Sequence, residues 1–178
     1  GTIITFILFL IILPSWGKVR WKTNHVWLNI GLNIKNKSKT FKKFLNGFLW
    51  SFFLVFSFLL FIFLCGWIDD FNYINFKSLF DAFVLLVGVG FAEEIIFRGW
   101  LMEEMILLFG PKRGIVIESA VFSLCHYRSD IGFIALIPFL SSLFLFGLVL
   151  TLRRTIDKGD LWGCIGLHGG LVGTWYLI

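Results

Sequence analysis

The chain has 178 residues, of which 58% are hydrophobic, and a mean hydropathy of +0.87. This composition excludes a soluble globular domain and places the chain among membrane proteins. The formal net charge is +5, and residues 1–68 contain no acidic residue, so the first part of the chain is strongly basic. The three cysteines lie in apolar runs, which predicts neither a disulfide framework nor a CxxC metal site.

Residues 1–43 are predicted to form a partial first span, which stops near Pro14, and a basic connector over residues 15–43. Because the sequence begins with Gly1 and ends inside an apolar run, we expect it to lack sequence at one or both ends. Tryptophans mixed with lysines are typical of a segment at the membrane interface. The same charge could mark a patch for anionic lipid or nucleic acid. A cytoplasmic loop that follows the positive-inside rule accounts for it, so we expect no nucleic-acid partner.

Residues 44–178 are predicted to form the membrane core. Its expected elements, in chain order, are a span over 44–68, a polar turn at Asp69–Asn72, a helix over 78–109, a shorter helix over 114–127, a span over 131–152 and an apolar run over 161–178. The sequence therefore predicts an all-α, polytopic transmembrane bundle of about five to six spans, counting the partial first one.

The helix over residues 78–109 is longer than a minimal span, and the strong breaker Gly110-Pro111 ends it. We expect this helix to be tilted, kinked or broken, with Gly88 and Gly90 as the weak points.

The loops alternate in charge along the chain. The connector, Lys112-Arg113 and residues 153–158 are basic, whereas residues 69–75 and 128–130 are acidic or mixed. This alternation supports a multi-pass integral membrane protein whose basic loops lie on the cytoplasmic side.

Three ionisable residues interrupt the apolar helix over 78–109. Glu94 and Arg98 are four residues apart and share a helix face in the favourable order, with the acid N-terminal to the base. Glu93 points about 100° away from Glu94 around the helix. Because ionisable groups within the membrane are costly and usually functional, the pattern suggests that Arg98 neutralises Glu94 and leaves Glu93 free for chemistry. A purely structural Glu94–Arg98 clasp is the alternative.

Two further apolar helices each carry one histidine, His126 and His168. A lone histidine in such a helix often only bonds a neighbouring helix. Together, however, the glutamates and histidines predict a polar cavity between the helices. Two histidines and two glutamates can bind zinc with an open water position, or can activate water directly between a glutamate and a histidine.

The joint pattern resembles the CPBP family of intramembrane proteases, also called the CAAX-protease/bacteriocin-processing or Abi family. The family's EExxxR motif is similar to Glu93–Arg98, its FxxxH motif to Phe122–His126, and its third motif to His168. The family often has asparagine four residues after the third-motif histidine, where this chain has Val172, and Thr174 could replace that asparagine only in another helix register. The resemblance covers about residues 78–178, with all three motifs in the family's order.

The resemblance implies an intramembrane endopeptidase that hydrolyses a peptide bond in a membrane-associated or prenylated, CAAX-type protein or peptide. Glu93 would be the general base with His126 as its partner, Glu94 and Arg98 would fix the motif helix, and His168 would stabilise the oxyanion. In a zinc-dependent version, Glu93, His126 and His168 would hold the metal and Glu94 would be the base. The expected partners are membrane lipids and a membrane-bound substrate.

Two other functions fit the same residues. A catalytically silent scaffold or bacteriocin-immunity-type binding protein of the same family is the first, and Val172 favours it. An ion or proton transporter that uses the buried carboxylates is the second, but the local pairing of Glu94 with Arg98 argues against it.

Four other polar residues are expected to lie outside the site. We expect Glu118 to reach the interface or pair with Arg113. Glu103 and Glu104 are expected to be interfacial near Lys112 and Arg113, and His25 to have no partner.

Overall fold

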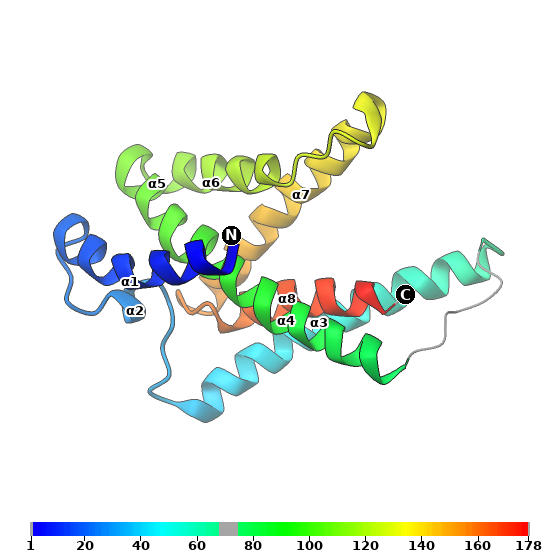
Figure 1. Cartoon of the computed structure of the whole chain (residues 1–178), viewed down its shortest axis with the longest axis horizontal. Helices are drawn as coiled ribbons and strands as arrows, with labels where there is room; N and C mark the ends of the chain where they lie inside the picture. The colour runs from blue at the N-terminus through cyan, green and yellow to red at the C-terminus, as the bar shows by residue number, and fades with distance from the viewer. Residues whose placement is uncertain (1, 68–74, 178) are drawn as a thin grey trace.

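The computed structural model describes residues 2–67 and 75–177, and every regular element within them is helical (Figure 1). The elements are α1 (Thr2–Arg20), α2 (Val26–Asn29), α3 (Lys37–Leu64), α4 (Phe76–Glu94), the π-helix η1 (Ile95–Leu101), α5 (Met102–Phe109), α6 (Pro111–Cys125), α7 (Gly132–Ile156) and α8 (Trp162–Tyr176). The all-helical prediction is confirmed, while the expected polar turn at Asp69–Asn72 lies outside the described residues. Among the described residues, α1, α3 and α7 are long and apolar enough to cross a membrane.

Local sequence signals explain where several helices begin and end. The side chain of Asn36 accepts a hydrogen bond from the backbone N–H of Lys39 and so caps α3. Asn75 caps α4 in the same way through Ser78. Gly110, with φ of 78°, ends α5, and Pro111 follows as the first residue of α6. The predicted breaker is therefore confirmed.

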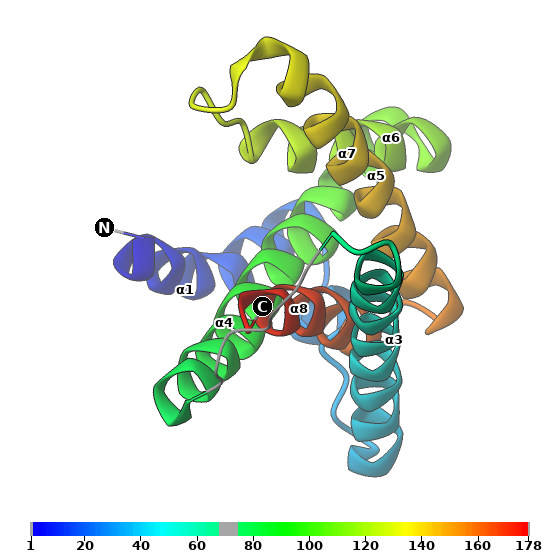
Figure 2. The same cartoon turned by 90° about the vertical axis from the view of Figure 1, so that its right-hand side faces the viewer.

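Glycines let α8 lie directly against α3 on one side and α4 on the other (Figure 2). A Cβ atom added to Gly166 would stand 2.1 Å from the carbonyl oxygen of Phe44 in α3. A Cβ on Gly90 of α4 would stand 2.6 Å from the Cα of Gly169. Small residues allow helix backbones to approach this closely in membranes. These close contacts on both sides of α8 fix the position of His168, which lies between Gly166 and Gly169 in the sequence.

The long helix over α4, η1 and α5 does not break where we expected. Gly88 and Gly90 lie within continuous α4, and the irregularity comes later, at Ile95–Leu101. Gly90 serves the close contact with α8 instead of a bend. The wider π turn contains Arg98, and π-helical insertions occur frequently at functional sites.

Glu103 does not lie near Lys112 and Arg113 as we expected. Its carboxylate accepts a hydrogen bond from Arg154 of α7, with Oε1 2.9 Å from Nη2. Arg154 is itself buried and also donates to the backbone oxygen of Arg98, at 2.6 Å. A π-helix leaves backbone carbonyls poorly paired, so this contact satisfies one carbonyl of η1 and ties α7 to it.

Glu104 also departs from the expectation, because it holds the N-terminal helix. Its Oε1 accepts hydrogen bonds from the indole Nε1 atoms of Trp16, at 2.8 Å, and Trp21, at 2.7 Å. Its Oε2 accepts one from Nε of Arg20, at 3.1 Å. The sequence showed basic and aromatic residues in the connector, but nothing in it indicated that an acid eighty-odd residues later would bind them.

The basic loops are predicted to share one side of the membrane. Figure 1 shows the α5–α6 turn and the α7–α8 turn toward one end of the long axis, and the α6–α7 turn toward the other. In a cysteine-free background, single cysteines at Lys112 and Lys158 should react with an impermeant maleimide from the same side, and one at Asp130 from the opposite side. Labelling of positions 112 and 158 from opposite sides would contradict the span assignment.

Candidate active site

The end of α4, η1, the end of α6 and the middle of α8 meet and bring the predicted residues together. Glu93 and Glu94 are the last residues of α4, Arg98 lies in η1, His126 caps the C-terminus of α6, and His168 lies in α8. Residues from three separate parts of the sequence therefore form one polar cluster within apolar helices.

The inner part of the cluster is shut off from solvent. Glu94 and Arg98 are 0% exposed and His168 is 4% exposed. Oε1 of Glu94 accepts a hydrogen bond from Arg98 Nη1 at 3.2 Å and lies 2.7 Å from His168 Nδ1. Because a carboxylate only accepts, His168 carries its proton on Nδ1 in this contact. Glu94 therefore orients both the arginine and the histidine.

The outer part of the cluster is partly open. The side chains of Glu93 and His126 are 28% and 29% exposed. Oε2 of Glu93 lies 3.5 Å from His126 Nε2 and 3.9 Å from His168 Nε2. One carboxylate oxygen therefore faces both imidazole rings at the outer limit of a direct hydrogen bond.

The tautomer of His126 follows from its other ring nitrogen. Nδ1 lies 2.8 Å from the backbone oxygen of Phe122, which can only accept, so Nδ1 carries the proton. In the neutral ring Nε2 is then an acceptor, and it faces Glu93.

The Phe122 ring is the apolar centre around which the polar groups pack. Its centroid lies 4.0 Å from the Arg98 guanidinium carbon, 4.7 Å from the His126 ring and 5.8 Å from the His168 ring. A cation over an aromatic face is attracted to it, and the ring excludes water from the Arg98 side. Phe122 thus has a physical role in the FxxxH spacing.

Glu118 belongs to the cluster, which the sequence reasoning missed. It is 0% exposed, and its Oε1 lies 3.5 Å from Arg98 Nε. The expectation that it reaches the interface or pairs with Arg113 is wrong, because α6 turns this face inward. The signal was present in the sequence: Glu118, Phe122 and His126 are spaced four apart and lie on one helix face.

The cluster is not fully satisfied by its own hydrogen bonds. Among the described residues, the buried atoms Glu93 Oε2, Glu94 Oε2, Arg98 Nε, Arg98 Nη2 and Glu118 Oε1 have no hydrogen-bond partner. Two carboxyl groups, those of Glu94 and Glu118, share the Arg98 guanidinium. Natural proteins satisfy most buried polar groups, and exceptions concentrate where groups are kept for chemistry or for bound water.

Two other residues named above lie apart from these contacts. His25 is exposed and lies in the connector between α1 and α2. Val172 is half-buried in α8, one turn after His168, and its side chain has no hydrogen-bond donor for an oxyanion.

Glu93 Oε2 and the Nε2 atoms of His126 and His168, the predicted zinc ligands, face one another at 3.5 and 3.9 Å. To bind zinc, all three atoms would have to lie about 2.0–2.2 Å from one common point. Within residues 2–67 and 75–177, no group of three or more His, Cys, Asp or Glu side chains is placed to hold a metal ion.

The all-helical bundle therefore encloses acids, an arginine and two histidines, with three helices that can span a membrane. The model of one family, described as Type II CAAX prenyl endopeptidase Rce1-like, matches residues 75–173, more than half of the chain. The chain belongs to this family of membrane proteases, as its motifs predicted. No curated protein matches it, and neither does any solved structure.

The matched stretch begins at α4 and ends within α8, so it contains every residue of the cluster described above. The family and the three apolar helices that can span a membrane identify an integral membrane protein.

Proposed function

We propose that this protein is an intramembrane endopeptidase that hydrolyses a peptide bond near the C-terminus of a prenylated, membrane-bound protein. The observation that carries the proposal is the position of Glu93. Its partly exposed carboxylate faces the Nε2 atoms of His126 and His168 at the end of an apolar helix. The description of the family supports the prenylated CAAX-type substrate.

In the proposed reaction, Glu93 is the general base. A water molecule between Glu93 and His126 donates one hydrogen to each, which turns an oxygen lone pair toward the substrate carbonyl. The water oxygen forms a bond to the carbonyl carbon while Glu93 takes one proton. The C–N bond then breaks, and the protonated Glu93 gives the proton to the leaving amine.

His168 is the proposed stabiliser of the oxyanion. Its Nδ1–H is held by Glu94, so the ring orientation is fixed and Nε2 faces the reaction space. When Nε2 is also protonated, it donates to the negative oxygen of the tetrahedral intermediate.

Glu94 and Arg98 are proposed to hold the catalytic side chains in position. They take no part in the bond-breaking steps, which belong to Glu93, His126 and His168. Both are wholly buried, and Glu94 links Arg98 to His168. This arrangement keeps the rigid end of α4 aligned with α8. Positioning groups of this kind affect rate because an error of about 1 Å can lower it a hundredfold.

Zinc is the other way to activate the water. Glu93, His126 and His168 would hold it through Oε2 and the two Nε2 atoms, and the metal would supply an acidified water. The proposal assigns that work to Glu93 because its carboxylate already lies beside both imidazole rings.

A catalytically silent family member remains the second candidate, and Val172 is the specific observation in its favour. Valine removes a hydrogen-bond donor one turn from His168. A scaffold has no need of a partly open carboxylate between two histidines, so the geometry favours the enzyme.

A farnesylated CAAX peptide in lipid vesicles tests the proposal directly. Purified protein should release the C-terminal tripeptide, detectable by mass spectrometry, and should cleave the unprenylated peptide much more slowly. No cleavage of either peptide would favour the scaffold. Equal cleavage of both would keep the protease and remove the prenyl specificity.

Chelation separates the two ways of activating water. Treatment with 1,10-phenanthroline is expected to leave cleavage unchanged, with a non-chelating phenanthroline isomer as the control. Loss of activity that added zinc restores would replace Glu93-activated water with the metal-dependent version.

A further inference from the structure

The connector between α1 and α3 forms one wall of a groove that is apolar at one end and basic at the other. The apolar end is a cavity of about 370 Å³ lined mainly by residues 24–28 and 32–35. The basic end is a cavity of about 390 Å³ between the start of α3 and the α7–α8 turn. A third cavity, of about 590 Å³, shares lining residues with each of them, and Asn33 lines all three.

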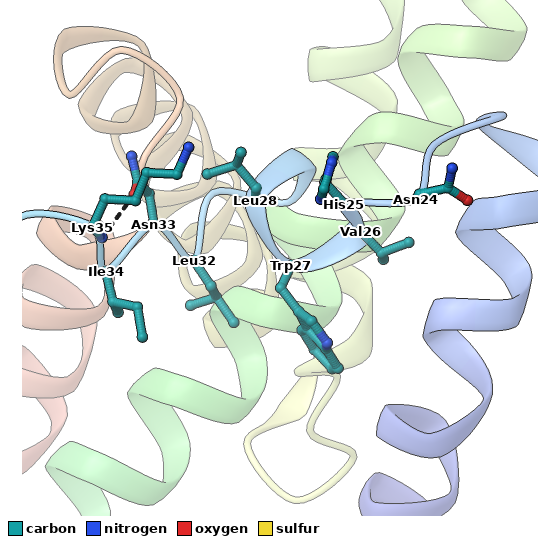
Figure 3. Close-up of a pocket in the computed structure, with 9 residues that line it drawn as sticks. All are labelled: Asn24, His25, Val26, Trp27, Leu28, Leu32, Asn33, Ile34 and Lys35. Atoms are coloured by element: carbon teal, nitrogen blue, oxygen red, sulfur yellow. Dashed lines mark hydrogen bonds between the residues drawn. The ribbon is translucent and has the colours of Figure 1, made fainter.

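The apolar end has the arrangement of a segment at a membrane interface. Figure 3 shows the Trp27, Leu32 and Ile34 side chains extending to one side of the connector, while those of His25, Leu28 and Lys35 extend to the other. Trp27 is 40% exposed and Ile34 is 62% exposed. Apolar side chains this open on one side, with mainly polar ones opposite, fit a segment that lies in the boundary between headgroups and acyl chains.

The basic end holds three lysines and one carboxylate. Lys43 binds the Asp160 carboxylate and donates to the backbone oxygen of Asp157, at 2.8 Å. Lys39 and Lys158 line the same cavity and form no ion pair with any described residue. The cavity therefore keeps a net positive charge.

Two backbone features add to this charge. Asn36, the cap of α3, lines the cavity, so the positive end of a 28-residue helix dipole lies there too. Lys158 has φ of 59°, a conformation that most side chains avoid, and it places this lysine opposite the start of α3.

We propose that this groove binds the headgroup of an anionic phospholipid, with the phosphate at Lys39 and Lys158 and an acyl chain along Trp27 and Ile34. The basic end supplies charge complementarity, and basic pockets of membrane proteins at the membrane surface bind such headgroups. The apolar end selects a lipid over a soluble phosphate, because a soluble anion would leave the exposed apolar wall uncovered. This site lies outside the acid–histidine cluster and does not depend on the proposed reaction.

The test uses the purified whole chain in detergent micelles, with phosphatidylglycerol or phosphatidylcholine added and bound lipid counted by native mass spectrometry. Wild type is expected to retain phosphatidylglycerol in preference to phosphatidylcholine. The double variant Lys39→Gln/Lys158→Gln should bind phosphatidylglycerol about tenfold more weakly, since each basic residue near the surface contributes substantially to anionic lipid binding. The variant Lys39→Arg/Lys158→Arg should retain wild-type binding.

The matched control is Lys22→Gln/Lys42→Gln. It removes the same charge from two lysines that line none of the three cavities. Lys22 has φ of 55°, and Lys42 is exposed near the start of α3. Its binding should change less than about twofold. Equal retention of the two lipids by wild type would overturn the proposal, as would equal losses in the control and the groove variant. Displacement of phosphatidylglycerol by an equal concentration of glycerol phosphate would overturn the choice of a lipid.

Discussion

Glu93→Gln is expected to lower kcat on the farnesylated peptide about a thousandfold, with little change in KM. Gln keeps the size of the side chain but cannot take a proton, and positioned acid–base groups typically contribute about 10²–10⁴ to rate. Glu93 is partly exposed and its Oε2 has no hydrogen-bond partner among the described residues, so the substitution removes no folded-state hydrogen bond of that atom. Thermal unfolding should therefore match wild type.

The partner histidine gives the second arm of the same experiment. His126→Ala should lower kcat strongly as well, because it removes the second acceptor of the water. The combined variant should be little worse than either alone, since groups that act on one water are not additive. Asp130→Asn is the control, an exposed carboxylate in the α6–α7 turn. A Glu93→Gln protein with wild-type kcat would refute the assignment of the general base.

The sequence was sufficient for the parts of the site that depend on spacing along one helix. Four-residue spacing placed Glu94 against Arg98, and the resulting ion pair has Oε1 and Nη1 3.2 Å apart. Apolar runs broken by charge gave the helical class and the breaker at Gly110-Pro111. These signals are local, so no knowledge of packing was needed.

Contacts between distant elements could not be predicted in the same way. The distance of Glu118 from the nearest loop predicts a position at the interface, whereas the rotation of α6 about its axis determines its burial. The π turn at Ile95–Leu101 contains one glycine, Gly99, and no proline. Glycines also occur in the regular part of the helix, so Gly99 does not mark where the π turn lies. The pairing of Glu104 with two tryptophans depends on how α1 docks, which hydrophobic periodicity alone does not give.

Arg98 shows why the missed glutamate matters for stability. Its guanidinium lies between two fully buried carboxyl groups, with Nη1 3.2 Å from Glu94 and Nε 3.5 Å from Glu118. Removal of one member of a buried ion pair leaves an uncompensated charge, which is more costly than the pair is favourable. The loss should exceed that of a simple two-residue clasp, because both carboxyl groups lose their counter-charge together.

Arg98→Ala is therefore expected to destabilise the protein by more than the ~3–5 kcal/mol typical of one broken buried pair, measured by unfolding in mixed detergent micelles. Arg113→Ala, an exposed arginine at the start of α6, should change stability by less than about 0.5 kcal/mol. Adding Glu118→Gln to Arg98→Ala should recover part of the loss, because one of the two stranded charges disappears. Glu118→Gln alone leaves Glu94 paired with Arg98, so its cost should be smaller than that of Arg98→Ala. Wild-type stability of Arg98→Ala, or no recovery in the double variant, would show that Arg98 does not bridge the two carboxyl groups.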